Sequence, residues 1–532
     1  MSIPLEHSAI RFVTLVNWIL LAVVSALLVT KLTASRLWGL SALVLSFGYV
    51  DSIVNEPGHP QAMVAIGTIL IPLLATYSSR MSVKTTWLLL GFTGGVVLHL
   101  KLNAGAFVIA AMSVVLLCSH SFVAWRGVMR TLVVIGTLCF PFVLMWPLLS
   151  DPNCLAFAAL MGVSAAAVSL NIEPKVDPFS QSRTALLAFS LGILAASMLA
   201  ISYSALRGAS PLDIIGSLLG YREGQIQFYH FFRSYSALQL ALACVSAAVA
   251  CVILWTGKHR NIIWLLWVAR VVFIVMACYA LAVDSPAYAH TMLGLAGPWV
   301  WVILVRKRED GSALARMMLA AVAVWSPLLA FPIPGSQLYF GSLAILLVAL
   351  VNFADVAQML CEKYTKYTYS QWLRALPAVV LFGGLSLLLI EGLSVRSQYR
   401  DYAPLALPGT EYMRMEPQRA RVFGQLVEAI DGSDVVLTTF RFNSLYFWGD
   451  ARAPVPTYLS HAPLAFTGEE QQAQLRQALD SAEFPKIVTR LPLDSLRPES
   501  ELIAWIDHNF EAYRKIGGYT ILRKLSVDSP IE

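Results

Sequence analysis

Charged residues are scarce in this chain. Of its 532 residues only 13% are Asp, Glu, Lys or Arg, whereas 57% are hydrophobic. In an ordinary soluble domain about a quarter of the residues are charged, so this composition excludes a single water-soluble globule. The few charges are also unevenly distributed, because they are sparse before about Val395 and dense after it. The sequence therefore predicts two regions that lie in different solvents.

Cysteines and familiar catalytic motifs are also scarce. Six of the seven cysteines lie in or beside apolar runs, Cys361 lies in a basic loop, and none lies in the C-terminal region. With no CxxC pair, neither a disulfide framework nor a zinc site is indicated. The C-terminal region has no GxGxxG, Walker or Gx-Ser-xG motif. The basic residues cluster in short loops, which indicates membrane topology and not a nucleic-acid partner.

Apolar runs long enough to cross a bilayer recur as far as Leu393. A helix needs about 20 apolar residues to cross the hydrocarbon core, and about 14 such runs are present. The first run has no small-residue cleavage site after a basic start, so it is predicted to be a spanning helix and not a cleaved signal peptide. The predicted spans are 12–30, 37–50, 61–78, 86–100, 104–119, 131–148, 154–170, 184–205, 236–256, 262–282, 288–305, 316–331, 339–358 and 375–393.

Basic residues occur in alternate loops between these runs. Because Lys and Arg are retained on the cytoplasmic side, we place inside the loops that hold Lys31, Arg80, Arg126, Lys175, Lys258, Arg306 and Lys363. The segments predicted to face outside are 50–61, 99–105, 149–153, 203–235, 283–290 and 331–340. An even number of spans puts both termini outside. Two alternatives stay open: the N-terminus begins outside, or the chain is N-terminally shortened and one more helix upstream would place it inside.

From about Arg396 the composition becomes that of a soluble domain, predicted on the extracytoplasmic side. Helical spacing over 420–432 ends at Gly432, a favoured residue after a helix. Further predicted elements are helices at 469–482 and 499–513 and strands at 434–440, 486–491 and 519–525. Their alternation predicts a small, mostly parallel sheet covered by helices. The predicted fold is an α-helical polytopic membrane domain (1–394) followed by a soluble α/β domain (395–532).

The first predicted outer loop concentrates groups that can perform chemistry. Asp51, Glu56 and His59 place two carboxylates and an imidazole within eleven residues. Such a set can bind a divalent metal or supply a general base. A solvated turn shaped by Pro57 and Pro60 explains the same residues equally simply.

Three other outer segments carry candidate substrate-binding residues. Lys101 and Asn103 close the fourth span, where an ammonium can hold a phosphate or simply reach the headgroups. The segment 204–235 alternates apolar stretches with charge, as interfacial helices do, and its arginines can grip a lipid-linked phosphate or cap the bundle. In 331–340 two prolines and a glycine form a turn. Candidate residues in the last two segments are Arg222, Glu223, His230, Arg233, Gln337 and Tyr339.

Ionisable residues within the spans are few. Asp355 and Glu391 lie near predicted span ends, and the span centres are expected to be nearly free of charge. Since intramembrane ionisable residues mark ion or proton paths, this pattern weighs against a proton-coupled pump.

Several features together resemble the C-type superfamily of membrane glycosyltransferases, in particular bacterial members related to the protein O-mannosyltransferase group. They are GHPQ at 58–61, the span-closing KLNAG at 101–105, PGSQ at 334–337 and the C-terminal α/β domain. The resemblance implies an inner-membrane enzyme that moves a sugar from a polyprenyl-phosphate donor to a lipid, glycan or protein acceptor on the extracytoplasmic face. It implies no certain cofactor, and a divalent metal ion stays open.

One departure from that family concerns the base. Its members usually carry a catalytic Asp in the first outer loop after an initial helix, whereas the early outward carboxylates here are Glu6, Asp51 and Glu56. The resemblance therefore assigns the base to Asp51 or Glu56, or to a segment that this chain lacks. Two other functions stay open: a non-catalytic or differently catalytic envelope-glycan protein, such as a polymerase, ligase or accessory subunit, and a lipid or polysaccharide transporter.

Overall fold

The structure is a computed structural model in which the chain forms two compact units. One unit consists of Val13–Tyr221 with Phe231–Leu389, and Ile390–Glu532 make up most of the other. The structure describes residues 7–53, 60–119, 126–172, 179–210, 234–256, 263–283, 288–305, 312–330, 338–363, 369–439, 444–454, 469–490 and 501–525.

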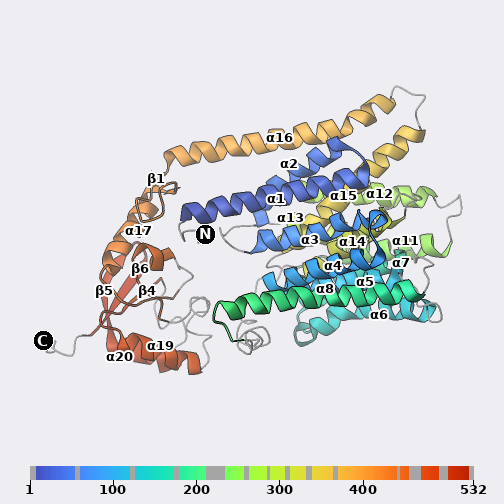
Figure 1. The fold of residues 1–532 in the computed structure, drawn as a ribbon. Helices are drawn as coiled ribbons and strands as arrows, with labels where there is room; N and C mark the ends of the chain where they lie inside the picture. Colours follow the sequence, from blue (N-terminus) through green and yellow to red (C-terminus); the bar gives the residue numbers. More distant parts are fainter. Residues whose placement is uncertain are drawn as a thin grey trace. The chain divides into compact units, whose positions relative to one another are not determined.

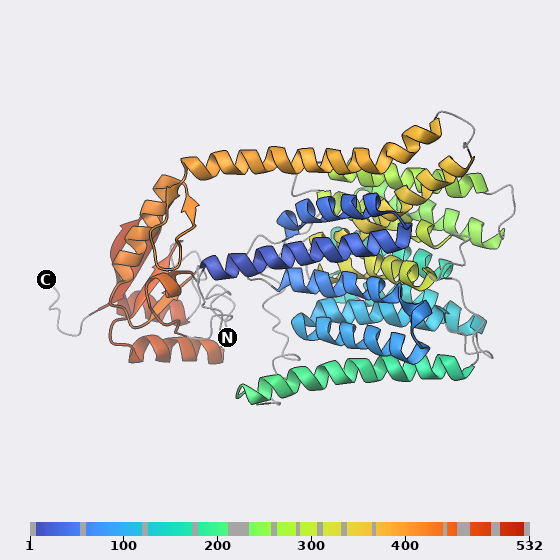
Figure 2. The ribbon, with the colours of Figure 1, turned by 45° about the horizontal axis from the view of Figure 1, so that its top comes forward.

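The first unit is a bundle in which long helices run side by side (Figures 1 and 2). Within the described ranges, ten helices are long and apolar enough to cross a membrane, and four shorter apolar helices accompany them at Arg36–Val50, Gln61–Ala75, Ala289–Leu304 and Ala313–Leu329. These segments correspond one for one to the predicted spans. The predicted fold class, a polytopic helical membrane protein with a small α/β domain, is confirmed. The boundary at residues 394 and 395 concerns the surrounding solvent and stays a prediction.

The elements of the bundle are α1 (His7–Thr33), α2 (Arg36–Ile53), α3 (Gln61–Ala75), η1 (Ser78–Arg80), α4 (Val83–Leu100), α5 (Leu102–Ser119), α6 (Arg126–Leu144), η2 (Trp146–Leu148), α7 (Pro152–Asn171), α8 (Phe179–Leu206), α11 (Ala237–Trp255), α12 (Ile263–Ala282), α13 (Tyr288–Thr291), η4 (Met292–Ala296), η5 (Gly297–Leu304), α14 (Ala313–Trp325), η6 (Ser326–Ala330), α15 (Leu338–Lys363) and α16 (Tyr369–Asp401).

Polar side chains define where several of these helices begin. The Asp151 carboxylate accepts hydrogen bonds from the backbone N–H groups of Asn153 and Cys154 and so caps α7. At α11 the Ser236 hydroxyl and the Gln239 side chain each accept a hydrogen bond from the other's backbone N–H. Such caps satisfy amide groups that the first helical turn leaves without partners.

Small residues bring α4 and α8 into close contact. A Cβ added at Gly91 would lie 2.1 Å from the carbonyl oxygen of Phe189, and one at Gly192 would lie 2.2 Å from that of Leu88. Glycine therefore permits this backbone approach, as it does in many membrane helix pairs.

Contacts between helix termini sort into two sets that agree with the predicted alternation. In one set the Lys31 ammonium lies 5.2 Å from the centre of the Tyr77 ring, and the Arg130 guanidinium donates to the Leu170 carbonyl. In the other set Asn103 Nδ2 donates to the Leu329 carbonyl at 2.9 Å. We name these the basic end and the Lys101 end of the bundle. Which end faces the cytoplasm stays a prediction.

The eleventh predicted span is not a regular α-helix. After the single turn α13, residues Met292–Ala296 form a π-helix and Gly297–Leu304 a 3₁₀-helix. Pro298 has no N–H to continue an α-helical ladder. Its carbonyl accepts a hydrogen bond from Ser246 Oγ at 2.7 Å, and Trp301 Nε1 donates to the same hydroxyl at 2.9 Å. These two bonds join the irregular segment to α11 through Ser246.

The second unit contains β1 (Ala403–Pro404), β2 (Arg414–Met415), α17 (Pro417–Ile430), β3 (Val436–Thr438), α18 (Ser444–Trp448), α19 (Glu469–Ser481), β4 (Lys486–Thr489), α20 (Glu501–Asn509), β5 (Phe510–Ile516) and β6 (Tyr519–Lys524). The four-stranded sheet has the order β3-β4-β6-β5. Two buried clusters, centred on Leu426 and Ile487, form its core.

Two expectations for this unit were wrong. The sheet is mixed, because β3 and β4 are parallel whereas β6 is antiparallel to both β4 and β5. The helix expected over 499–513 ends at Asn509, and Phe510–Ile516 form β5. A tight turn explains both errors, because Gly517 and Gly518 have positive φ angles of 53° and 85° and close a hairpin that favours antiparallel pairing.

Candidate functional site

The predicted base and its neighbours fall only partly within the described structure. Asp51 lies in the last turn of α2, where the backbone is described and the side chain is not. Glu56 and His59 lie outside the described residues. The helices that flank these residues are described, and their ends bound the position of the loop.

Helix α2 is tied near Asp51 to the start of α15. The Tyr49 hydroxyl, two residues before Asp51, forms a short hydrogen bond with Ser342 Oγ in α15. Both side chains are buried. Tyr339 lies three residues before Ser342 on the same helix, with its side chain outside the described residues, as is Gln337. The termini that carry Asp51 and Tyr339 consequently lie together.

The same corner extends through η6 to Asn103. A Cβ added at Gly341 would lie 2.5 Å from the backbone nitrogen of Pro327, so α15 packs closely on η6. At the end of η6, the Leu329 carbonyl accepts the hydrogen bond from Asn103 at the start of α5. A continuous series of contacts thus leads from the end of α2 to the α4–α5 turn.

Lys101 is the single residue that joins α4 to α5. Its backbone is extended, with φ −158° and ψ 109°, and its carbonyl accepts a hydrogen bond from Gly105 at 2.9 Å. Gly105 allows the tight reversal, because a Cβ there would lie 2.1 Å from the Leu98 Cα. Burial lowers the pKa of the Lys101 ammonium to about 8. An anion bound beside it would reverse that shift, since an opposite charge favours the protonated form.

Two histidines at the Lys101 end add imidazole groups to this region. His99 precedes Lys101 by two residues, and its buried Nε2 has no hydrogen-bond partner within the described structure. His290 in α13 stacks against Tyr235, with ring centroids 4.3 Å apart. From the sequence, His290 was placed only as the last residue of the predicted outward segment 283–290. Its contact with Tyr235 joins residues 55 positions apart, which no local pattern signals.

In the predicted outer segment 203–235, few side chains belong to the described structure. Arg222, Glu223, His230 and Arg233 lie outside the described residues. Arg207, at the end of α8, is exposed and donates to the Tyr203 hydroxyl at 3.3 Å on its own helix. A role for this segment in holding phosphate stays a prediction.

Metal binding also stays open. Within the described ranges no group of three His, Cys, Asp or Glu side chains could hold a metal ion. The predicted set of Asp51, Glu56 and His59 lies outside this search.

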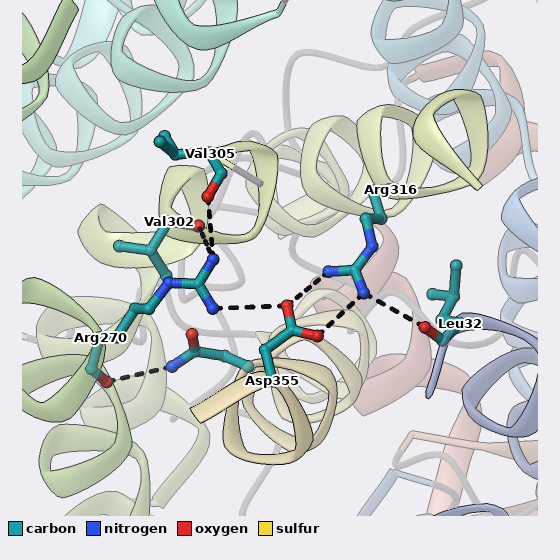
Figure 3. Close-up of polar contacts among 7 residues, drawn as sticks. Leu32, Arg270, Val302, Val305, Arg316 and Asp355 are labelled. Atoms are coloured by element: carbon teal, nitrogen blue, oxygen red, sulfur yellow. Dashed lines mark hydrogen bonds and ion pairs between the residues drawn. The ribbon is translucent and has the colours of Figure 1, made fainter. Parts of the chain in front are cut away.

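A second polar centre, at the basic end, was missed by sequence reasoning. Asp355 in α15 is bound by two arginines from other helices (Figure 3). Arg316 in α14 reaches its carboxylate through both terminal nitrogens, at 2.7 and 3.0 Å, and Arg270 in α12 approaches it at 3.4 Å. All three side chains are at most 5% exposed. Asp355 and Arg316 lie near the ends of predicted spans, whereas Arg270 lies in the middle of the predicted span 262–282 and departs from the expectation that span centres are nearly free of charge.

Backbone carbonyls at helix ends meet the surplus positive charge of this cluster. Arg270 Nη2 donates to the carbonyls of Val302 and Val305, at 3.2 and 3.0 Å, where η5 ends. Arg316 Nη2 donates to the Leu32 carbonyl at 3.2 Å in the last turn of α1. Helix C-termini carry partial negative charge. The cluster therefore joins α1, α12, α14, α15 and η5 through charge-assisted hydrogen bonds.

The fold places the chain among polytopic α-helical membrane proteins with an appended α/β domain. No family model matches the sequence, and no curated protein matches it. Among solved structures, the chain is similar to the crystal structure of the Archaeoglobus fulgidus oligosaccharyltransferase in complex with zinc and sulfate, at 9% identity and a TM-score of 0.33. The alignment covers 95% of this chain and 60% of that one, so the chain spans about three fifths of its length.

Proposed function

We propose that the chain is a membrane glycosyltransferase related to the C-type superfamily, in particular to bacterial members of the protein O-mannosyltransferase group. It transfers a sugar from a polyprenyl-phosphate donor to an acceptor at the Lys101 end. The observation that carries this proposal is the series of contacts Tyr49–Ser342, Gly341–Pro327 and Leu329–Asn103. These contacts bring the helix ends that flank Asp51, Lys101 and Tyr339 to one corner of the bundle.

The reaction needs a base on one side of the sugar and a cation on the other. The acceptor oxygen bonds to the anomeric carbon while the bond from that carbon to the phosphate oxygen breaks, and polyprenyl phosphate leaves with the electron pair. Asp51 or Glu56 takes the acceptor proton or helps to hold a metal ion. Lys101 lies beside the leaving phosphate, where a fixed cation stabilises the developing charge.

The environment of Lys101 suits a phosphate that binds and is released in each reaction cycle. Burial disfavours its charged form when the site is empty, which is why its pKa lies at about 8. A phosphate oxygen at the ammonium raises that pKa again. We propose that Asn103 positions this turn through Leu329, and that His59, Arg222, Glu223, His230, Arg233, Gln337 and Tyr339 line the same substrate region.

The proposed setting is the bacterial inner membrane. The Lys101 end faces away from the cytoplasm, since the opposite end carries Lys31, Arg80 and Arg130. The C-terminal α/β domain is proposed to lie on the same extracytoplasmic side.

The test is sugar transfer in membranes that express the chain, measured with radiolabelled sugars on a panel of polyprenyl phosphates. The variants are Asp51→Asn, Glu56→Gln and Lys101→Ala. Lys84→Ala is the matched control, because Lys84 is an exposed lysine at the other end of α4. We expect one carboxylate variant to abolish transfer, Lys101→Ala to weaken it at least tenfold, about the loss of one charge-assisted hydrogen bond, and the control to leave it unchanged.

Two other results would contradict parts of this proposal. If Lys84→Ala and Lys101→Ala reduced transfer equally, Lys101 would have no specific role at the phosphate. If neither the wild type nor a version extended at the N-terminus transferred any sugar from the panel, the glycosyltransferase proposal would be rejected.

A further inference from the structure

A cavity of about 300 Å³, lined by both apolar and polar residues, lies at the basic end of the bundle. Its walls come from the α1–α2 turn, α15 and the start of α16. The lining residues include Ser35, Trp38, Asp355, Gln358, Arg374 and Pro377. We propose that this cavity binds the phosphate headgroup of an anionic phospholipid in the leaflet at the basic end.

The cavity lies beside the first turns of α16, around Pro377. Farther along, α16 packs closely on α2, where a Cβ added at Gly384 would lie 3.0 Å from Val44. At Pro377 the carbonyl accepts a hydrogen bond from Ser41 at 3.0 Å, and a proline inside a helix bends it. Figure 2 shows the bend in the early part of α16.

The cavity lies beside a helix whose apolar surface is mostly exposed. Only 6% of the apolar window of α16 is buried, so this helix is exposed along nearly all of its apolar length. Trp38 and Pro377 line the cavity, and Leu37, which also lines it, is 42% exposed. These apolar walls suit the glycerol backbone and first methylene groups of a lipid, beside polar groups that suit its headgroup.

The charge of the cavity favours an anion. Asp355 lines the cavity, and its carboxylate is bound by Arg270 and Arg316, which are not among the lining residues; the cluster of these three side chains carries a net positive charge. Arg374 adds an exposed guanidinium to the wall. The opposing carboxylate nearby is Glu362, which accepts a hydrogen bond from Gln358 Nε2 at 2.9 Å. The buried cluster and the two exposed groups Arg374 and Glu362 together contain three arginines and two carboxylates, and this net charge of +1 favours an anion.

Hydrogen-bond donors are present at the α1–α2 turn. Ser35 lies at the start of α2, where its hydroxyl accepts the backbone N–H of Trp38 at 3.5 Å and can donate its own proton outward. The start of a helix also presents backbone N–H groups to an anion. Basic pockets between spanning helices are a recurrent type of site for anionic headgroups.

The experiment compares lipid retention by the full-length protein in nanodiscs of phosphatidylglycerol and phosphatidylcholine with identical acyl chains. Retained lipid is counted by native mass spectrometry. The variants are Arg374→Ala, which removes the guanidinium, and Ala357→Leu, which fills the cavity wall. Arg80→Ala is the matched control, because Arg80 is an exposed arginine at the same end.

We expect the wild type to retain phosphatidylglycerol in preference to phosphatidylcholine. Arg374→Ala should lower that retention about tenfold, the loss of one charge-assisted hydrogen bond, and Ala357→Leu should lower it as well. Arg80→Ala should have no effect, and inorganic phosphate should not compete. Equal retention of both lipids, equal loss in Arg374→Ala and Arg80→Ala, or full competition by inorganic phosphate would overturn the proposal. This test does not depend on sugar transfer.

Discussion

Two neighbouring polar residues at the Lys101 end have separate tasks. Asn103 makes a defined hydrogen bond that joins α5 to η6, whereas Lys101 is a partly desolvated charge in the turn itself. Both were identifiable from the sequence, because polar residues that end an apolar run are conspicuous. The partner of Asn103 was not identifiable, since Leu329 is 226 residues away and offers only a backbone carbonyl.

Replacing Asn103 by alanine should affect stability and transfer together. The Leu329 carbonyl would lose its donor, which costs about 1–3 kcal/mol when the group stays buried. We expect a lower unfolding temperature in detergent and weaker sugar transfer. Ser113→Ala, in the same helix, removes a hydroxyl that donates only to Ile109 of its own turn and should change neither. A stable Asn103→Ala protein with normal transfer would contradict the proposed role of Asn103.

The pKa of Lys101 predicts a pH dependence for donor binding. Below a pH of about 8 the ammonium is charged and can neutralise a phosphate, whereas above it the amine becomes neutral. We therefore expect the KM for the polyprenyl-phosphate donor to rise as the pH increases through this value. In Lys101→Arg the rise should disappear, because arginine stays protonated. The same alkaline rise in both proteins would assign it to another group.

At the scale of elements, hydropathy predicted the spans and their order because each bilayer crossing needs a long apolar run, whatever its tertiary partners. Local composition could not predict the pattern of backbone hydrogen bonds within each run. The segment 288–305 is largely apolar, yet it combines α, π and 3₁₀ turns around Pro298, whose carbonyl accepts a hydrogen bond from Ser246. Likewise residues 510–513, the first part of β5, were assigned to a helix, because pairing with β6 determines their conformation.

The ion cluster shows a similar limit. Arg270, Arg316 and Asp355 lie on three helices, and each looks like an isolated charge in its own run. Only their packing makes one cluster of them, in which the carboxylate is shared unequally: Arg316 binds it through two nitrogens and Arg270 through one. This inequality has a measurable consequence.

Asp355→Ala should destabilise the bundle much more than Arg270→Met does. The first change leaves two buried guanidinium groups without their carboxylate, which costs about 3–5 kcal/mol. The second leaves the two-nitrogen pair of Arg316 with Asp355 intact and removes bonds to two carbonyls, which costs about 1–3 kcal/mol. Unfolding temperatures measured in the same detergent test this order. If Arg270→Met lowered the unfolding temperature more than Asp355→Ala, Arg270 and not Asp355 would contribute most to the stability of the cluster.

For the whole molecule, charge and contacts determine different parts of the topology. Contacts such as Lys31–Tyr77 and Asn103–Leu329 show which helix ends lie together, and alternate loops supply the excess of Lys and Arg at one of the two ends. No membrane enters those contacts, so the orientation rests on the retention of basic loops in the cytoplasm. It determines on which side of the membrane both the proposed transfer and the proposed lipid site would operate.

Reporter fusions test that orientation directly. Alkaline phosphatase fused after Glu532 should be active and a fluorescent protein at the same point dark, because the former needs an oxidising compartment to form its disulfides. The opposite result is expected for fusions within the loop after Lys258, which belongs to the basic set. If both positions reported the reverse, the Lys101 end would face the cytoplasm, and transfer from a donor in the outer leaflet would be impossible there. If both positions reported the same side, one span between them would not cross the membrane, and the irregular segment α13–η5 would be the first to examine.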